Sequence, residues 1–204
     1  MNLVIEIQYF APVSLFYHLH KIRNAVFEVY EHYQKLSFRN RCFLASANGP
    51  ISISIPVRGG RNVRQLITEI QVAPGNWREQ HWRTISTCYR KAPWFDHYAA
   101  SLQELYQSEY DMLSDWNLAC FEWVCRQLSL DISHAGTDCF QKVLDPDRFL
   151  DLRNKVLPKN YKEFPAPRYI QLFEERVGFQ PNLSILDLLF CCGPQSRTVL
   201  GNTK

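Results

Sequence analysis

His81 is the residue whose type and setting most strongly suggest proton transfer. In the stretch "NWREQHWRTISTCY" it shares one face of a predicted helix with Trp77, Ile85 and Cys88 rather than with charged side chains. Apolar surroundings shift the pKa of an imidazole, and a general acid or base works best when its pKa lies near the working pH. The sequence therefore predicts that His81 is catalytic, with Asp96 as its partner.

The same pattern also has an ordinary structural explanation. A histidine on an apolar helix face must find hydrogen-bond partners, and one that finds them in the core ties neighbouring elements together. The helix is expected to end before Pro93, and the turn there would bring Asp96 and Tyr98 towards His81. The sequence is therefore consistent with two interpretations of His81, a catalytic imidazole and a hydrogen-bonded core histidine.

Two other stretches carry side chains suited to binding a substrate. In "SFRNR", Arg39, Asn40 and Arg41 stand just before a predicted strand, and a guanidinium offers paired N–H donors that match a carboxylate or phosphate. Gln8 and Tyr9 stand where another strand gives way to a helix, which is the usual rim of an α/β ligand crevice. We expect these five residues to bind substrate, the alternative for the arginines being surface charge.

Polar residues inside apolar helical stripes give further candidates. Asn117 lies in such a stripe, where a buried amide either anchors a neighbouring loop or binds substrate. Asp187 lies three residues after Ser184 in "SILDLLFCC", so a helix cap explains its position, but its leucine neighbours indicate partial burial. Asp187, Asn117 and Tyr98 therefore join the substrate-binding candidates.

Composition argues against several classes of protein. The 204 residues carry a formal charge of +3, and most basic residues are interspersed with acids, which speaks against nucleic-acid binding; the basic run over residues 58–64 is the local exception. The seven cysteines mostly sit in apolar segments without zinc-finger spacing, so we expect reduced thiols, no metal site and a cytoplasmic location. No apolar run is long enough to span a bilayer. The sequence identifies no cofactor and leaves the oligomeric state open.

The N-terminal third, which must position Gln8, Tyr9 and the arginines, is rich in β-type runs. A helix is expected over residues 14–22, directly after Pro12. The pair Asn48-Gly49 between two alternating runs predicts a hairpin. The expected strands cover residues 3–10, 25–31, the hairpin within 41–57, and 66–73.

The remainder, which must position His81, Asn117 and Asp187, is mainly helical. Ser184 and Gly193 supply the start and stop signals of the last helix, 185–192. Residues 131–167 are predicted to be an irregular excursion with one short helix, and the other helices are expected over 77–89, 94–107 and 110–128. We therefore predict an α/β fold, a single domain over 1–204 with a mixed sheet from the N-terminal third, packed by helices from the middle and the C-terminus.

Five blocks, taken in order, resemble the WbqC-like protein family of bacteria. They are "IEIQYFAPVSLFYHLHK", "YEHYQKLSFRNRC" followed by "ISIPV", "NWREQHWRTISTCYRKAPWFDHY", "NLACFEWV" and "GFQPNLSILDLLFCCGPQS". The resemblance implies a transferase of an amino-acid or acyl group, acting on an amino-sugar or nucleotide-sugar in O-antigen or other surface-polysaccharide biosynthesis. The alternative is a non-catalytic binding or scaffold protein of the same pathway.

The resemblance also bears on the site. It implies, without assigning roles, that the family's recurrent polar positions fall on Gln8, Tyr9, Arg39, Asn40, Arg41, His81, Tyr89, Asp96, Tyr98, Asn117, Asn182, Ser184, Asp187 and Gly193. Longer members carry an additional α/β segment where this chain has residues 131–167, so a cofactor site in that segment would be missing here. We expect the candidate side chains, His81 among them, to converge on one concave pocket beside the sheet.

Overall fold

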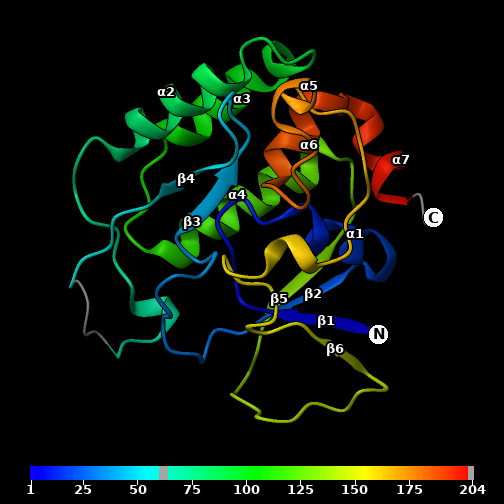
Figure 1. Cartoon of the computed structure of the whole chain (residues 1–204). Helices are drawn as coiled ribbons and strands as arrows, with labels where there is room; N and C mark the ends of the chain where they lie inside the picture. Colours follow the sequence, from blue (N-terminus) through cyan, green and yellow to red (C-terminus); the bar gives the residue numbers. More distant parts are fainter. Residues whose placement is uncertain (60–63, 202–204) are drawn as a thin grey trace.

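Four short parallel strands form the main sheet of the computed structural model, which describes residues 1–59 and 64–201 (Figure 1). β1 (Asn2–Ile5) pairs with β2 (Asn24–Phe27) on one side and with β6 (Phe149–Asp151) on the other. β5 (Ser133–Gly136) pairs with the far side of β2, giving the order β5-β2-β1-β6. Because all the pairs are parallel, the carboxyl ends of the four strands meet at one edge of the sheet.

The central strand owes its position to an uninterrupted apolar run. Leu3, Val4 and Ile5 are all buried, as expected for a parallel strand covered on both faces. The chain then enters α1 (Val13–Ile22), which packs on β1 and β2 and returns the chain to β2. α1 ends at Arg23, whose φ of 60° lies in the left-handed region that stops a helix.

The predicted hairpin is confirmed and forms a separate two-stranded sheet. β3 (Arg41–Leu44) pairs antiparallel with β4 (Ile51–Ser54), and Ser46 and Gly49 exchange backbone hydrogen bonds at the turn. Ile53 is buried while Ser52 and Ser54 are exposed, so the predicted dry and wet faces are also confirmed.

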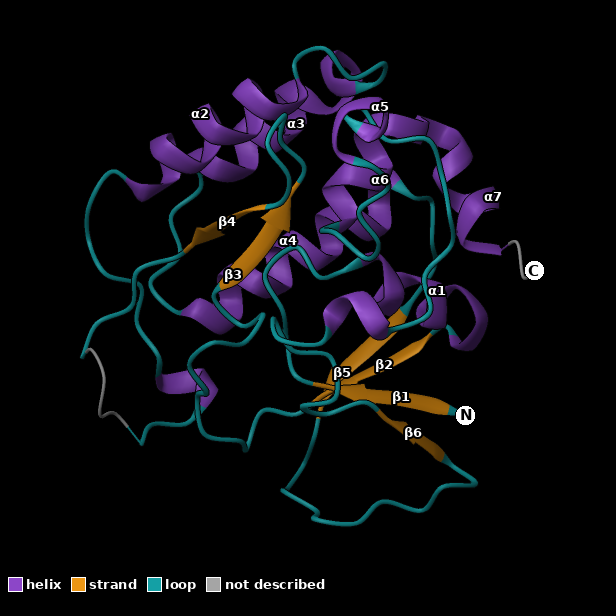
Figure 2. Cartoon of the chain, in the orientation of Figure 1, coloured by secondary structure: helices purple, strands orange, loops and turns teal. Residues whose placement is uncertain are grey.

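The predicted helices are confirmed to within a few residues. α2 (Trp77–Tyr89), α3 (Phe95–Gln107), α4 (Leu113–Gln127) and α6 (Ile185–Cys192) lie where the helical period placed them, and Figure 2 shows them gathered on the side of the sheet that carries α1. The chain also forms the short helices α5 (Glu174–Val177) and α7 (Ser196–Gly201), and single turns η2 (Ile67–Glu69), η3 (Tyr161–Glu163) and η4 (Gly193–Gln195).

The predicted ends of α6 are confirmed. The Ser184 hydroxyl accepts a hydrogen bond from the Leu186 amide, and Gly193 has a φ of 54°. A Cβ at Gly193 would collide with the Trp94 ring, so this position needs glycine for space as well as for conformation.

The α/β class is confirmed, but several details differ from expectation. The strands expected over 3–10 and 25–31 end at Ile5 and Phe27. The expected mixed sheet is two separate sheets, because the main sheet is all parallel and the antiparallel hairpin stands apart from it. Residues 66–73 form the turn η2 and isolated bridges rather than a strand, because Gln71 and Val72 pair with separate partners, Met112 and Val57. Residues 131–167 are not simply irregular: they supply β5 and β6, and the helix expected near residues 147–156 is β6 instead. Every residue of β5 is exposed, so this strand carries no apolar period and is held by its pairing with β2.

Residues 60–63 of the basic run lie outside the described part. Across residues 1–59 and 64–201, no helix combines the length and the apolar character needed to cross a membrane.

Candidate functional site

A polar residue follows each strand of the parallel sheet at its carboxyl edge. Glu6 follows β1, Glu28 follows β2 and Thr137 follows β5, while Arg153 lies two residues beyond β6. The chain leaves β1 towards β2, whereas β6 lies on the opposite side of β1, so the strand order reverses between β1 and β6. Ligand sites of open α/β sheets lie at such a reversal, beyond the carboxyl ends of the strands.

Arg39 forms the centre of one half of this edge. Its fully buried guanidinium makes a two-pronged ion pair with Glu31 and donates to Asn154 Oδ1 over 2.8 Å. Arg39 Nη2 also lies 4.0 Å from the buried carboxylate of Glu6. Glu6 accepts hydrogen bonds from Gln8 Nε2 at 3.0 Å and from the Asn154 backbone N–H at 2.8 Å. These contacts join the ends of β1 and β6 to the loop over residues 31–39.

Arg153 forms the centre of the other half. One nitrogen, Nη1, donates to Glu28 Oε2 at 2.8 Å, and its other donors reach both oxygens of Asp151. Thr137 donates its hydroxyl to the second oxygen of Glu28 at 2.8 Å. Hydrogen bonding from Arg153 lowers the pKa of Asp151, and the same bond raises the pKa of Arg153. Ion pairs therefore join the ends of β2 and β6, and a hydrogen bond to Glu28 joins the end of β5 to them.

Two amides fix the backbone on either side of the Arg39 guanidinium. Asn117, on α4, donates to the backbone carbonyl of Arg39 at 2.6 Å. Asn40 donates to the carbonyl of Ile55, whose own N–H returns a bond to the Asn40 carbonyl. The position of Arg39 thus depends on α4 and on the end of the hairpin as well as on the sheet.

Carboxylates outnumber guanidiniums in this charged cluster. Four acids, Glu6, Glu28, Glu31 and Asp151, face the two arginines, Arg39 and Arg153. Burial raises the pKa of Glu31 even though Arg39 acts in the opposite direction. Within the described residues, the buried atoms Arg39 Nη1 and Gln8 Oε1 have no hydrogen-bond partner. An excess of negative charge at this partly buried edge favours binding of a cationic group.

The cluster faces two cavities that share Arg153 and that we call together the sheet-edge crevice. Their volumes are about 580 Å³ and 340 Å³, which suits small-molecule ligands. Glu28 and Thr137 line the smaller cavity. The larger is lined by Tyr30, Glu31, His32, Gln34, Phe140, Lys142, Asp151, Arg153, Asn154 and Lys155.

Two exposed aromatic rings stand at the larger cavity. Tyr30 is 46% exposed and Phe140 is 56% exposed, and both line it. The Arg153 guanidinium lies 5.5 Å from the centre of the Phe140 ring, close enough for a cation–π contact. Exposed rings beside hydrogen-bonding groups offer a stacking surface for a sugar or a nucleobase.

His81 and Tyr9 lie together in the core, away from this cluster. His81 is only 6% exposed; its Nδ1 accepts from the Tyr9 hydroxyl at 2.9 Å, and its Nε2 lies 3.2 Å from the Ser54 carbonyl. Tyr106 hydrogen bonds to the same Tyr9 hydroxyl. Burial lowers the pKa of His81 to about 4, so its imidazole is neutral at pH 7 with both nitrogens engaged.

The remaining candidates occupy separate places. Asp187 is fully buried, where burial raises its pKa, and it accepts bonds from Tyr89, Tyr169 and Gln171 at 2.9, 2.8 and 2.9 Å. Asp96 is exposed in the first turn of α3, whereas Tyr98 on the same helix is buried. Arg41 is half-buried at the start of β3.

The expectation of one shared pocket is therefore corrected. Gln8 and Arg39 enter the charged cluster, Asn40 and Asn117 support the backbone beside it, and the other candidates lie elsewhere. The reason is that each buried polar side chain is paired by a different neighbouring element across the core, for example His81 by Tyr9 and Asp187 by Tyr89, so these side chains do not face one common cavity. The catalytic and binding roles assigned to the individual residues stay predictions.

Sequence reasoning missed most of the cluster. Glu6 and Glu28 each follow an apolar β-type run directly, in "LVIE" and "AVFE", which is a usable signal for the carboxyl end of a parallel strand. Arg153 and Asn154 had no such signal, because their strand was not predicted. Glu31 was missed because the strand was expected to cover 25–31, whereas β2 ends at Phe27.

In the described part of the chain, no three His, Cys, Asp or Glu side chains gather in a way that could hold a metal ion. All seven cysteines are free.

The fold and the crevice define an α/β protein with a polar site at the carboxyl edge of a parallel sheet. The chain belongs to the WbqC-like protein family, whose model matches residues 8–161 and 140–199. It is 26% identical over 192 residues to the uncharacterized protein Rv1507c of Mycobacterium tuberculosis, covering 82% of this chain and 83% of that protein. No solved structure matches it.

Replacing Arg39 tests how far the fold depends on the charged cluster. Arg39→Met leaves Glu31 and Glu6 buried without their cation, so we expect a loss of about 3–5 kcal/mol in the free energy of unfolding. The measurement is urea denaturation at neutral pH. The matched control is Arg83→Met, which breaks an exposed ion pair with Glu79 and is expected to cost less than about 1 kcal/mol. Equal, small losses in both variants would show that the cluster is not structural.

Stability below neutral pH tests the placement of His81. The pKa of His81 falls from 6.5 in the unfolded chain to about 4 in the folded one, so between these values only the unfolded chain binds the proton. Above pH 6.5 the titration of His81 does not lower the free energy of unfolding. As the pH falls from 6.5 towards 4, the free energy of unfolding decreases by about 3 kcal/mol through this group. Urea denaturation across this range should show a shallower pH dependence for His81→Gln. His97→Gln, at an exposed position, is the control. If His81→Gln left the slope of unfolding free energy against pH unchanged, the imidazole of His81 would not be buried and neutral.

Proposed function

We propose that this protein is a transferase that binds an amino-sugar or nucleotide-sugar at the sheet-edge crevice. The observation that carries the proposal is the combination found there: exposed rings of Tyr30 and Phe140 beside a buried floor of paired carboxylates and guanidiniums. Sugars and nucleobases stack on aromatic rings, while their polar substituents hydrogen bond to charged side chains. Neither feature alone would favour this class of ligand.

The charges around the crevice fit a ligand that carries both signs. The excess of carboxylates in the cluster would receive the ammonium group of an amino sugar. Lys142 and Lys155 line the same cavity and are exposed, so they can meet a phosphate of a nucleotide moiety. A nucleotide-activated amino sugar satisfies both requirements.

The pathway is the part of the proposal that rests on family resemblance. Membership of the WbqC-like family supports surface-polysaccharide biosynthesis, including O-antigen, as the setting. The mycobacterial relative is uncharacterized and therefore adds no activity.

Transfer of an acyl or aminoacyl group to a sugar amine has simple requirements. A nitrogen–carbon bond forms, and the bond between the acyl carbon and the leaving group of an activated acyl donor breaks. Starting from the ammonium form, the nitrogen gives up two protons: one can leave with the departing group, and one must be removed before the nitrogen can attack. The latter needs an accessible base. His32 lines the crevice and is exposed, whereas His81 has both ring nitrogens engaged in the core, so His32 is the better-placed imidazole for this step.

A non-catalytic binding or scaffold protein is the second candidate. One observation favours it: the carboxylates of Glu6, Glu28 and Asp151 all accept hydrogen bonds within the cluster, which leaves them less able to act as bases. In that case the crevice would bind the same sugar without turning it over.

Removing either aromatic ring tests the proposed binding. We expect Tyr30→Ala and Phe140→Ala each to raise the dissociation constant for UDP-glucosamine about tenfold, because stacking on an aromatic side chain contributes about 1–3 kcal/mol. Isothermal titration calorimetry measures this directly. Ile170→Ala is the matched control, since Ile170 is also an exposed large apolar residue but lies away from the crevice.

The outcomes separate the two candidates. Loss of affinity in the crevice variants alone, together with acylated sugar in an incubation with activated acyl donor, supports the transferase. The same binding without product at any donor concentration supports the scaffold. Binding that neither ring affects would contradict the crevice as the site.

A further inference from the structure

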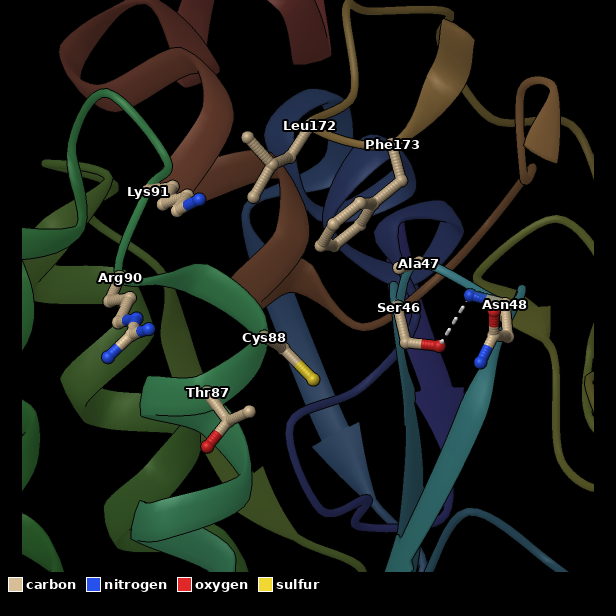
Figure 3. A pocket seen from close by; sticks show the side chains of 9 residues that line it. All are labelled: Ser46, Ala47, Asn48, Thr87, Cys88, Arg90, Lys91, Leu172 and Phe173. Carbon is tan, nitrogen blue, oxygen red and sulfur yellow. Dashed lines mark hydrogen bonds between the residues drawn. The ribbon is translucent and has the colours of Figure 1, made fainter. Parts of the chain in front are cut away.

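A third cavity lies at the tip of the hairpin and shares no lining residue with the two cavities of the sheet-edge crevice. It has a volume of about 520 Å³ and is formed by three segments (Figure 3). The hairpin turn gives Ser46, Ala47 and Asn48, and residues 172–173 give Leu172 and Phe173. The C-terminal part of α2 and the turn after it give Thr87, Cys88, Arg90 and Lys91. We call this the hairpin-tip cavity.

The inner wall of the hairpin-tip cavity is apolar. Figure 3 shows the Phe173 ring pointing into the space from one side and the Cys88 sulfur from another, with Leu172 and Ala47 around them. Cys88 is buried, and this burial raises the pKa of its thiol to about 11. The thiol is therefore neutral at pH 7 and contributes an apolar surface rather than a charge.

The charged lining of this cavity has one sign only. Arg90 and Lys91 are both exposed and line it, and no carboxylate is among its lining residues in the described part of the chain. Among residues 1–59 and 64–201, neither cation has a carboxylate within ion-pair distance. The sheet-edge crevice differs, because Glu31 and Asp151 line it beside its cations. A neighbouring cavity beyond Leu172 is lined by Glu174 and Glu175, which shows how local this positive charge is.

A further donor stands on the opposite wall. Asn48 accepts a hydrogen bond from Arg176 through Oδ1 at 3.3 Å, and its backbone N–H bonds to Ser46. Its side-chain nitrogen makes no hydrogen bond within the described residues. An apolar hollow with two cations and a free amide donor at its mouth is complementary to an anion that carries a hydrocarbon body.

We infer that the hairpin-tip cavity binds a small amphiphilic carboxylate. The hydrocarbon part lies against Phe173, Leu172 and Cys88, and the carboxylate meets Lys91 and Arg90 at the mouth. This site shares no residue with the sheet-edge crevice and does not depend on the transferase proposal.

Calorimetric titration with octanoate and with its neutral isostere octanamide tests the inference on the full chain. We expect octanoate to bind about tenfold more tightly than octanamide, because only the carboxylate gains the ionic contacts. The double variant Arg90→Glu with Lys91→Glu should remove this preference without unfolding the protein, since both side chains are exposed. Phe173→Ala should weaken both probes alike.

The control places the same charge change in the other site. Lys142→Glu with Lys155→Glu alters two exposed cations of the sheet-edge crevice and should leave octanoate affinity unchanged. Octanoate affinity lost in this control but kept in the Arg90 and Lys91 variant would overturn the inference. Equal affinity for octanoate and octanamide, or no binding of either, would overturn it as well.

Discussion

Two glutamates at the ends of buried parallel strands impose the constraint on which the rest of the structure depends. Glu6 and Glu28 are fully buried, and a buried carboxylate without a partner is strongly destabilising. The chain must therefore bring cations and N–H donors to the carboxyl edge from outside the sheet. It does so with Arg39 from the loop before the hairpin and with Arg153 and Asn154 from the end of β6.

This pairing links parts of the fold that would otherwise be independent. Arg39 connects the edge of the sheet to the hairpin and, through its carbonyl, to Asn117 on α4. Arg153 holds the connection around β6, where the strand itself is only three residues long. The same side chains that hold these segments form the floor of the crevice, so structural and binding demands meet in one place. Three exposed side chains around this floor take no part in the ion pairs and are free to contact a ligand: Tyr30, His32 and Phe140.

The elements that the sequence predicted well are those with a long apolar period. α2, α3 and α4 each bury a stripe of large side chains, and each helix begins and ends close to the ends of its stripe. β5 and β6 could not be predicted, because short edge strands with exposed or half-buried residues are defined by the strand beside them. For the site, Gln8 and Arg39 were predictable from their type and place, and Glu6 and Glu28 from their position after apolar runs. His81 shows the limit: a catalytic imidazole and a core imidazole on an apolar helix face have the same pattern, and only its contacts with Tyr9 and Ser54 distinguish them.

Backbone amide chemical shifts of the isotopically labelled protein, followed during titration with UDP-glucosamine, test most directly whether the charged edge of the sheet is the ligand site. The account predicts that the shifts concentrate at residues 28–34, 137–142 and 151–155, which line the crevice and its floor. Shifts concentrated around His81 on α2, or a titration that saturates without moving any of these three segments, would contradict it.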